Sequence, residues 1–436
     1  MKLPFALLVR LRGDSSFALM ARVVMTRSLS LGVTVFTGLL TAAVLGPAGR
    51  GEQAALIVAP QFLAGLASLG LHASLIYNMR RDPEHEREYF GANLIMTFLS
   101  ASIVAGIGWV LEPYWLRSYG SDTIMLARTF LCATPILATS WSLRAAAEVR
   151  GWFDFSNRLV FLQNIGILAT LLVIIHLGWL TPGRSAAIYI VSNVPVFVCL
   201  GFRTHRRIRP ILTLRTPFPG RLLHYGLRFY GVDLLGTLSG YLDQIVIVAL
   251  LPPSAVGIYV VARSVARILG VVSEAVASVL FPRIIAKPAV IIVEMVAKAL
   301  RVTNIISVAP ALVLGVAAPF LVKLVYGQQF ADVVAPMRIL IASTLLVSSA
   351  RLLYQAYAGS GRPEAITAFE AIGTAVSFVA MLGFVPLFGL IGAACAILLA
   401  SMVRLACALA GLRIVLGVPV PRLVFAWSDV RSAINR

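Results

Sequence analysis

Long apolar runs alternate along the chain with short polar segments, most of which are basic. A helix needs about 20 apolar residues to cross about 30 Å of hydrocarbon, and twelve runs meet that length. We expect these spans at Ser28–Pro47, Gln53–Tyr77, Tyr89–Leu111, Ile124–Ala146, Leu159–Leu180, Ser185–Phe202, Tyr225–Leu250, Ala255–Phe281, Val302–Val325, Val334–Ala358, Ala365–Phe388 and Leu390–Gly411. The pattern therefore predicts an all-α polytopic membrane protein with about twelve transmembrane helices.

Composition agrees with this class of protein. The chain has 436 residues, of which 59% are hydrophobic and 13% charged, and its mean hydropathy is +0.90. Soluble domains are only about 45–50% apolar. The net charge of +19 would also fit a nucleic-acid-binding protein, but the basic residues lie between apolar runs instead of clustering on one soluble face. We therefore expect membrane lipids, and no nucleic acid, as partners.

The distribution of basic residues predicts the orientation in the membrane. If the N-terminus is cytoplasmic, the inside segments include Arg80, Arg81, Arg87, Arg150, Arg158, Arg203, Arg206, Arg207, Arg283, Arg301 and Arg413. The outside loops then hold far fewer, and the longest of them is the short segment Glu112–Thr123. By the positive-inside rule both termini are cytoplasmic, and no soluble domain is expected on the outer face.

The longest polar interruption falls after six spans and leaves six more. It is the basic segment RTHRRIRPILTLRTPFPGR, which begins at residue 203. We expect an N-terminal six-helix bundle at residues 1–202, a cytoplasmic linker at 203–222, and a C-terminal six-helix bundle with a short tail at 223–436. Two halves in the same orientation predict a pseudo-two-fold axis along the membrane normal.

The two halves also begin alike. Each has a helix, a tight turn and a second helix, in LTAAVLGPAGRGEQAALIV and in VIVALLPPSAVGIYVVARS. Aligning Gly51 with Gly257 places Pro47 over Pro253, which favours an internal repeat.

Ionisable residues inside the membrane are the candidate site residues, because they are costly there unless they face a cavity or a partner. In the eighth span Arg263 and Arg267 are four residues apart, and Glu274 lies on nearly the same face. Two guanidinium groups on that face could bind a pyrophosphate through paired hydrogen bonds. In the alternative interpretation, Arg263 pairs with Asp243 and only joins the seventh and eighth helices.

Carboxylates inside the spans are candidates for ion coupling. Asp233 and Asp243 in the seventh span could exchange protons or bind sodium, and Glu274 is a further candidate for ion coupling or a salt bridge. If Arg263 pairs with Asp243, that salt bridge could also break during alternating access. By contrast, His72 and His176 are isolated in apolar surroundings, and we interpret them as packing residues or as hydrogen-bonding residues within the bundle.

A second group of charges lies in the inner halves of the last three spans. Arg351, Glu370 and Arg404 are expected to form one neutralising cluster with a structural role. The four cysteines have no metal-ligand spacing, no residues form a phosphate-binding loop, and we expect neither a metal nor another cofactor.

Several segments, in this order along the chain, resemble the multidrug/oligosaccharidyl-lipid/polysaccharide exporter superfamily, and within it the polysaccharide-biosynthesis branch of Wzx-type O-antigen flippases. They are LGPAGRGEQAALIVAPQFLAGLASLGL, YLDQIVIVALLPPSAVGIYVVARSV, LFPRIIA, LVKLVYGQQF, AGSGRPE and PLFGLIGAACA. The resemblance implies two bundles in a V that alternate between inward-open and outward-open states in a bacterial inner membrane. The implied cargo is a polyprenyl-pyrophosphate-linked oligosaccharide for surface polysaccharide such as the O-antigen of lipopolysaccharide.

The resemblance also concerns Arg27. Relatives that flip pyrophosphate lipids carry basic residues near the start of the first helix, which makes Arg27 a candidate phosphate contact. Anchoring to anionic lipid headgroups is the simpler interpretation of a basic residue at that end.

Three other functions were weighed against the flippase. A drug or organic-cation exporter of the same superfamily should have an acidic cavity, which the arginines of the eighth span oppose. A polymerase or ligase acting on the same glycolipids generally needs a large outer loop with catalytic residues, so we expect no enzyme and no catalytic residue. A scaffold subunit without transport is the third alternative. The expected partners are the glycolipid, H⁺ or Na⁺ as coupling ion, and other polysaccharide-assembly membrane proteins.

Overall fold

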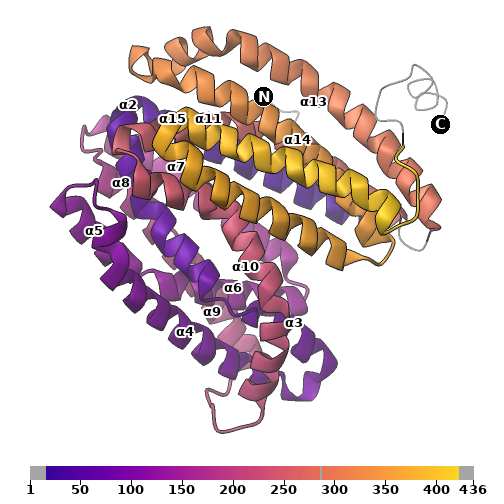
Figure 1. Cartoon of the computed structure of the whole chain (residues 1–436). Helices are drawn as coiled ribbons and strands as arrows, with labels where there is room; N and C mark the ends of the chain where they lie inside the picture. The colour runs from indigo at the N-terminus through magenta and orange to yellow at the C-terminus, as the bar shows by residue number, and fades with distance from the viewer. Residues whose placement is uncertain (1–15, 285–286, 422–436) are drawn as a thin grey trace. The chain divides into compact units, whose positions relative to one another are not determined.

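The computed structural model describes residues 16–284 and 287–421, and the side chains from residue 29 onward apart from residue 282. Within these ranges every regular element is a helix (Figure 1). The α-helices are α2 (Ser16–Leu66), α3 (Leu71–Arg81), α4 (Glu86–Trp115), α5 (Ser121–Leu131), α6 (Thr134–Val149), α7 (Phe153–His176), α8 (Pro182–Val191), α9 (Asn193–Ile208), α10 (Phe218–Leu250), α11 (Pro253–Ile268), α12 (Gly270–Ile284), α13 (Ala289–Tyr326), α14 (Val334–Gly359) and α15 (Pro363–Ile414). Two short 3₁₀ helices, η1 (Pro83–His85) and η2 (Gln328–Val333), complete the set.

Two of these helices are long enough to cross a membrane twice. α2 has 51 residues and α15 has 52, so at 1.5 Å per residue each exceeds twice the roughly 30 Å of the hydrocarbon layer. Each contains one non-helical glycine with positive φ, Gly46 at 68° and Gly389 at 55°. Glycine tolerates this conformation because it has no Cβ.

The number of membrane crossings agrees with the sequence. Nine described helices are long and apolar enough to span, or ten with the bent pair α11 and α12. The breaks at Gly46 and Gly389 divide two of them, which raises the number to twelve. The predicted all-α polytopic fold with about twelve spans is therefore confirmed.

Several spans are not the straight helices that the apolar runs predicted. The second span breaks between α2 and α3, where Leu69 and Gly70 have φ of 46° and 66°. The fourth divides between α5 and α6, with Pro135 in the first turn of α6, and the sixth divides between α8 and α9. The eighth bends by 41° between α11 and α12. Proline and glycine interrupt the helical hydrogen bonds without interrupting an apolar run.

The contacts divide the chain into two compact units. The division falls inside α10, between Thr237 and Leu238, and the short segment Gly46–Gly51 belongs to the second unit. In the first unit α3, α4, α6 and α9 pack around a core that includes Leu75 and Phe90. In the second unit α13, α14 and α15 lie side by side in Figure 1 and enclose a core that includes Tyr357. The predicted domain boundary at 203–222 stays a prediction.

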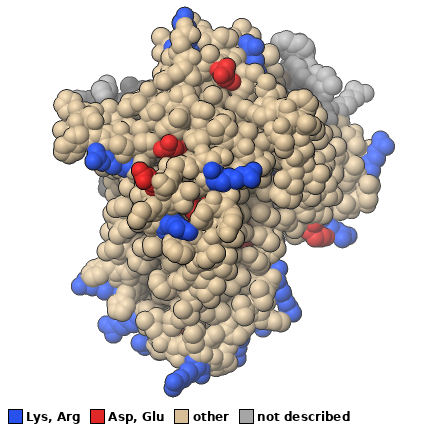
Figure 2. Space-filling model, turned by 60° about the vertical axis from the view of Figure 1, so that its left-hand side comes forward, with Lys and Arg blue, Asp and Glu red and all other residues tan. Residues whose placement is uncertain are grey.

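The surface has the character of a lipid-facing protein. Large apolar side chains such as Ile103, Val316 and Leu387 are more than 60% exposed. Figure 2 shows one face on which most of the area is uncharged, with lysine and arginine side chains around its edges and charged side chains of both signs in its upper middle part. A soluble monomer rarely exposes so much contiguous apolar surface.

The two turns that the sequence alignment matched contact each other within the second unit. A Cβ added at Gly51 would overlap the carbonyl oxygen of Pro253, and one at Gly257 would overlap the carbonyl oxygen of Pro47. The contact is reciprocal, as expected of equivalent segments that meet around a two-fold axis. The geometry therefore supports the alignment of Gly51 with Gly257.

Because these contacts involve backbone atoms, a side chain cannot rotate to relieve the overlap. We expect Gly257→Ala to lower the free energy of unfolding by about 1–3 kcal/mol, the usual cost of overpacking, and to lower the Tm of the purified protein in detergent. The control is Gly236→Ala in α10, where an added Cβ meets no atom within 4 Å. Equal Tm values for the two variants would contradict the close contact.

Candidate functional site

A polar cavity of about 290 Å³ lies within the second unit. Its charged lining consists of Asp243 on α10, Arg263 and Arg267 on α11, Glu274 on α12, Arg351 on α14, and Glu370 and Arg404 on α15. The cavity thus brings together four of the six residues that the sequence singled out, from three different helices. It also brings in the three residues that we expected to form a separate cluster.

Arg263 is held by Asp243. Their side chains form an ion pair at 3.0 Å, and the Asp243 side chain is only 6% exposed. The Tyr259 hydroxyl donates to the same carboxylate at 2.7 Å, and Arg263 also donates to the carbonyl of Gly240 at 2.8 Å. The alternative interpretation of Arg263, in which it joins α10 and α11, therefore describes its geometry.

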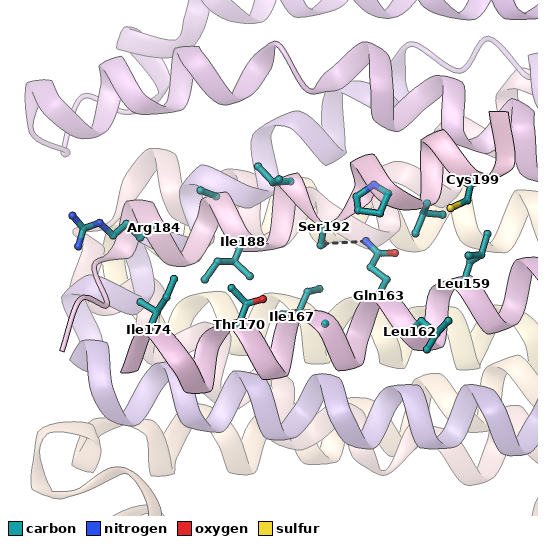
Figure 3. A pocket seen from close by; sticks show the side chains of 15 residues that line it. Leu159, Leu162, Gln163, Ile167, Thr170, Ile174, Arg184, Ile188, Ser192 and Cys199 are labelled. Atoms are coloured by element: carbon teal, nitrogen blue, oxygen red, sulfur yellow. Dashed lines mark hydrogen bonds between the residues drawn. The ribbon is translucent and has the colours of Figure 1, made fainter. Parts of the chain in front are cut away.

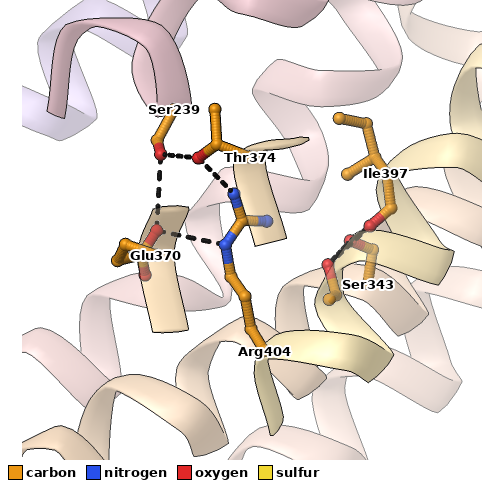
Figure 4. A network of polar contacts seen from close by, with 7 residues as sticks. Ser239, Ser343, Glu370, Thr374, Ile397 and Arg404 are labelled. Atoms are coloured by element: carbon orange, nitrogen blue, oxygen red, sulfur yellow. Dashed lines mark hydrogen bonds and ion pairs between the residues drawn. The ribbon is translucent and has the colours of Figure 1, made fainter. Parts of the chain in front are cut away.

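Arg404 and Glu370 form the centre of a second network, shown in Figure 4. Arg404 donates from Nε to Glu370 at 3.1 Å and from Nη2 to Thr374 at 3.2 Å. Ser239 donates to Glu370 at 3.3 Å and lies 2.7 Å from the Thr374 hydroxyl. Since the Arg404 side chain is only 10% exposed, this network supports the predicted structural role of Arg404 and Glu370.

The predicted three-residue cluster is wrong for Arg351. Its guanidinium pairs with Glu274 at 3.2 Å, and both side chains are more than half exposed. The reason is that α14, which carries Arg351, packs beside α12, which carries Glu274. An exposed pair of this kind has little net free energy and can open easily.

Arg267 differs from the other three arginines. It lines the cavity and is exposed, and within residues 29–284 and 287–421 it makes no ion pair with a carboxylate. Four arginines thus face three carboxylates, and each carboxylate already has an arginine partner. The cavity therefore has one positive charge in excess, at Arg267.

Asp233 lies outside this cavity, in the first unit. Its carboxylate is 3.6 Å from Nδ1 of His72, and the Ser68 hydroxyl donates to it at 3.5 Å. His72 thus contacts a polar residue of the bundle, because α3 places its ring beside α10. These residues border the break between α2 and α3, where the Tyr230 hydroxyl donates to the carbonyl of Leu66 at 2.7 Å.

The candidate phosphate contact Arg27 belongs to α2, but its side chain lies outside the described part of the chain. Among the described residues no group of three or more histidine, cysteine, aspartate and glutamate side chains could hold a metal ion.

Sequence reasoning missed the hydroxyl groups of the site. Tyr259 is four residues before Arg263, so the helical spacing could have placed both on one face of α11. Ser239 and Thr374 are 135 residues apart and carry no comparable signal.

The sequence was compared with known protein families. Residues 40–335, more than half of the chain, match the profile of a family described as polysaccharide biosynthesis protein. The chain belongs to that family. The match agrees with the polysaccharide-biosynthesis resemblance that the motifs carry. No curated protein matches its sequence.

Solved structures share the fold of this polysaccharide biosynthesis family member. The lipid II flippase MurJ in an inward closed conformation matches with a TM-score of 0.76 and 13% identity, over 95% of this chain and 90% of MurJ. The MATE transporter VcmN of Vibrio cholerae gives 0.61 and 15%, over 91% and 98% of the two chains. An inward-facing multidrug resistance MATE transporter gives 0.63 and 15%, over 88% and 93%. At these identities the likeness concerns the fold.

Proposed function

We propose that this protein is a flippase that carries a polyprenyl-pyrophosphate-linked oligosaccharide across a bacterial inner membrane by alternating access. The observation that carries the proposal is the excess positive charge at Arg267 in a polar cavity of the second unit. A pyrophosphate is the part of such a lipid that must leave water, and a guanidinium compensates it by charge-assisted hydrogen bonds. The family of polysaccharide biosynthesis proteins supplies the context in which such a lipid is needed.

The paired charges of the cavity argue against the main alternative function, an exporter of organic cations. An exporter of organic cations needs an unneutralised carboxylate to bind its cargo, and each carboxylate of this cavity pairs with an arginine. MATE transporters share the fold, so the argument against this alternative rests on the charge of the site and not on the architecture. The same site favours transport over catalysis, because each of its carboxylates, the groups that could act as general bases, pairs with an arginine.

The roles of the remaining candidates follow from their partners. Arg263 is proposed as a second substrate contact that becomes available when its pair with Asp243 opens, and Glu274 as a salt-bridge partner that Arg351 releases easily. Arg27 is proposed as a phosphate contact at the cytoplasmic entrance, with both termini cytoplasmic. We propose the domain boundaries 1–202, 203–222 and 223–436 as the functional halves and their linker.

Among the three candidate carboxylates, Asp233 is proposed as the ion-coupling residue. Asp243 and Glu274 are neutralised by arginines, which do not release their protons, whereas the partner of Asp233 is a histidine ring nitrogen 3.6 Å away. An irregular backbone segment at membrane depth, as between α2 and α3, also occurs at the ion sites of other transporters. H⁺ or Na⁺ is the proposed coupling ion.

The coupling role predicts the behaviour of Asp233→Asn. We expect wild-type translocation in liposomes to accelerate when a pH or sodium gradient is imposed. The variant should still equilibrate the glycolipid without a gradient but lose the acceleration, because asparagine neither binds nor releases a proton. Asp332→Asn, at an exposed carboxylate in η2, is the control. Equal acceleration in Asp233→Asn and wild type would rule out Asp233 as the coupling residue.

The proposed flippase function is tested by comparing two cargoes, a glycolipid and an organic cation. Purified wild-type protein is reconstituted in liposomes with a fluorescent polyprenyl-pyrophosphate glycolipid, and separately with a fluorescent organic cation. We expect the glycolipid to change leaflets only in vesicles that contain the protein, and the cation to stay where it is. Movement of the cation alone would favour the exporter, and movement of neither cargo under any ion gradient would favour the scaffold.

A further inference from the structure

A groove of about 670 Å³ lies within the first unit, between α7 on one side and α8 with α9 on the other (Figure 3). Its lining is apolar over most of its length, and the buried side chains of Ile167 and Val196 are part of it. The polar groups Gln163 and Ser192 satisfy each other by a hydrogen bond of 3.1 Å. The groove is therefore suited to an apolar chain and not to a polar solute.

The span that faces α7 consists of two helices. α8 ends at Val191 and α9 begins at Asn193, so the facing span is broken rather than straight. Opposite this break α7 carries Gly166, where an added Cβ would meet no atom within 4 Å. Protein interiors are close-packed, so an open apolar groove of about 670 Å³ is suited to an occupant from the bilayer.

Length and charge indicate which lipid fits. The lining extends along α7 from Leu159 to Ile174, about 22 Å at 1.5 Å per residue, which exceeds the roughly 15 Å of one leaflet. Arg184 lies at the end of the groove near Ile174 (Figure 3). It donates from Nη1 to the carbonyl of Trp179 at 2.9 Å, and a guanidinium has further N–H groups for an oxyanion.

We propose that this groove binds the tail of a polyprenyl phosphate lipid whose phosphate lies at Arg184. In the predicted orientation Arg184 is in an outside loop, so the lipid is bound with its headgroup at the outer face. The chain then follows α7 to Leu159 and Cys199, about 22 Å along the helix, which is longer than the roughly 15 Å depth of one leaflet. The choice of a polyprenyl lipid over other long-chain phosphates rests on the proposed function.

The test uses binding and not transport. A polyprenyl monophosphate without sugar, with a photoreactive group near the end of its tail, is added to protein in vesicles of zwitterionic and anionic phospholipids. After illumination, labelled peptides are identified by mass spectrometry. We expect labelling of α7 and α9 near Leu159 and Cys199, reduced about tenfold in Gly166→Phe, which fills the groove. Gly106→Phe, at another open helical glycine, is the matched control and should label like wild type.

A second variant tests the phosphate end without altering the groove. Arg184 is exposed, so Arg184→Glu should fold, and we expect it to reduce labelling by the polyprenyl phosphate but not by an uncharged polyprenol with the same photoreactive group. Equal labelling of Gly166→Phe and wild type would overturn the proposal. So would labelling of the groove by a photoreactive phospholipid that excess polyprenyl phosphate does not displace.

The outcome is separate from that of the flippase assay. If the groove is labelled but no glycolipid changes leaflets, the proposed function fails and the lipid site stands. If the glycolipid is translocated but the groove is not labelled, the lipid site fails and the proposed function stands.

Discussion

Replacing Arg267 with alanine is expected to reduce glycolipid translocation about tenfold, with no loss of folded protein. Arg267 is the cavity arginine without a carboxylate partner, so its removal leaves no charge unpaired. A hydrogen-bonded contact to a charged group contributes about 1.5 kcal/mol or more, and about 1.4 kcal/mol corresponds to a factor of ten. The initial rate in liposomes, measured by quencher accessibility, gives the effect directly.

Two variants sharpen this result. Arg267→Lys keeps the charge but loses the paired geometry, so its rate should lie between those of wild type and Arg267→Ala. Arg338→Ala removes an exposed arginine of α14 that donates to the carbonyl of Gly315 outside the cavity, and it should translocate like wild type. A wild-type rate in Arg267→Ala would exclude Arg267 as the headgroup contact while leaving the flippase itself intact.

Replacing Arg404 with methionine is expected to give the largest loss of stability. The substitution leaves Glu370 without its ion-pair partner in a part of the second unit where the Arg404 side chain is only 10% exposed. Breaking a buried pair in this way costs about 3–5 kcal/mol, which for a unit of this size lowers Tm by roughly 10 °C. Thermal unfolding of the purified variant in detergent measures the shift.

The double variant Arg404→Met with Glu370→Met distinguishes this cause from lost packing. Removing both charges abolishes the uncompensated carboxylate, so we expect Tm to recover by at least half of the shift. If the double variant is less stable than Arg404→Met alone, the network with Ser239 and Thr374 stabilises the unit in another way.

The sequence was sufficient for the spans but not for their breaks. Twelve runs could be found because each must be apolar over about 20 residues, whatever its internal geometry. Around Leu69 and Gly70 only Ser68 and His72 interrupt an otherwise apolar run, so the break between α2 and α3 could not be read from hydropathy. The turn at Gly46 was predicted, because Gly-Pro beside a basic residue is a strong signal.

The partner of a charged residue could be predicted only where both residues were expected at the same depth in the membrane. Asp243 and Arg263 were matched because both lie toward the outer third of adjacent spans. His72 and Asp233 are 161 residues apart, and the sequence has no signal that α3 and α10 meet at this level. Glu274 and Arg351 were missed for the same reason, since the choice between two acidic neighbours depends on which helices pack together.

The proposed function requires that the cavity of the second unit binds the pyrophosphate headgroup. Thr344 lines this cavity and can be replaced by cysteine in a protein whose four native cysteines are changed to serine or alanine. The measurement is the rate at which an anionic thiol reagent modifies Thr344→Cys, with and without the polyprenyl-pyrophosphate glycolipid. We expect the glycolipid to slow the modification several-fold in the protein that keeps Arg267. It should not slow the modification when Thr344→Cys is combined with Arg267→Ala. An unchanged rate at saturating glycolipid would contradict the proposed site.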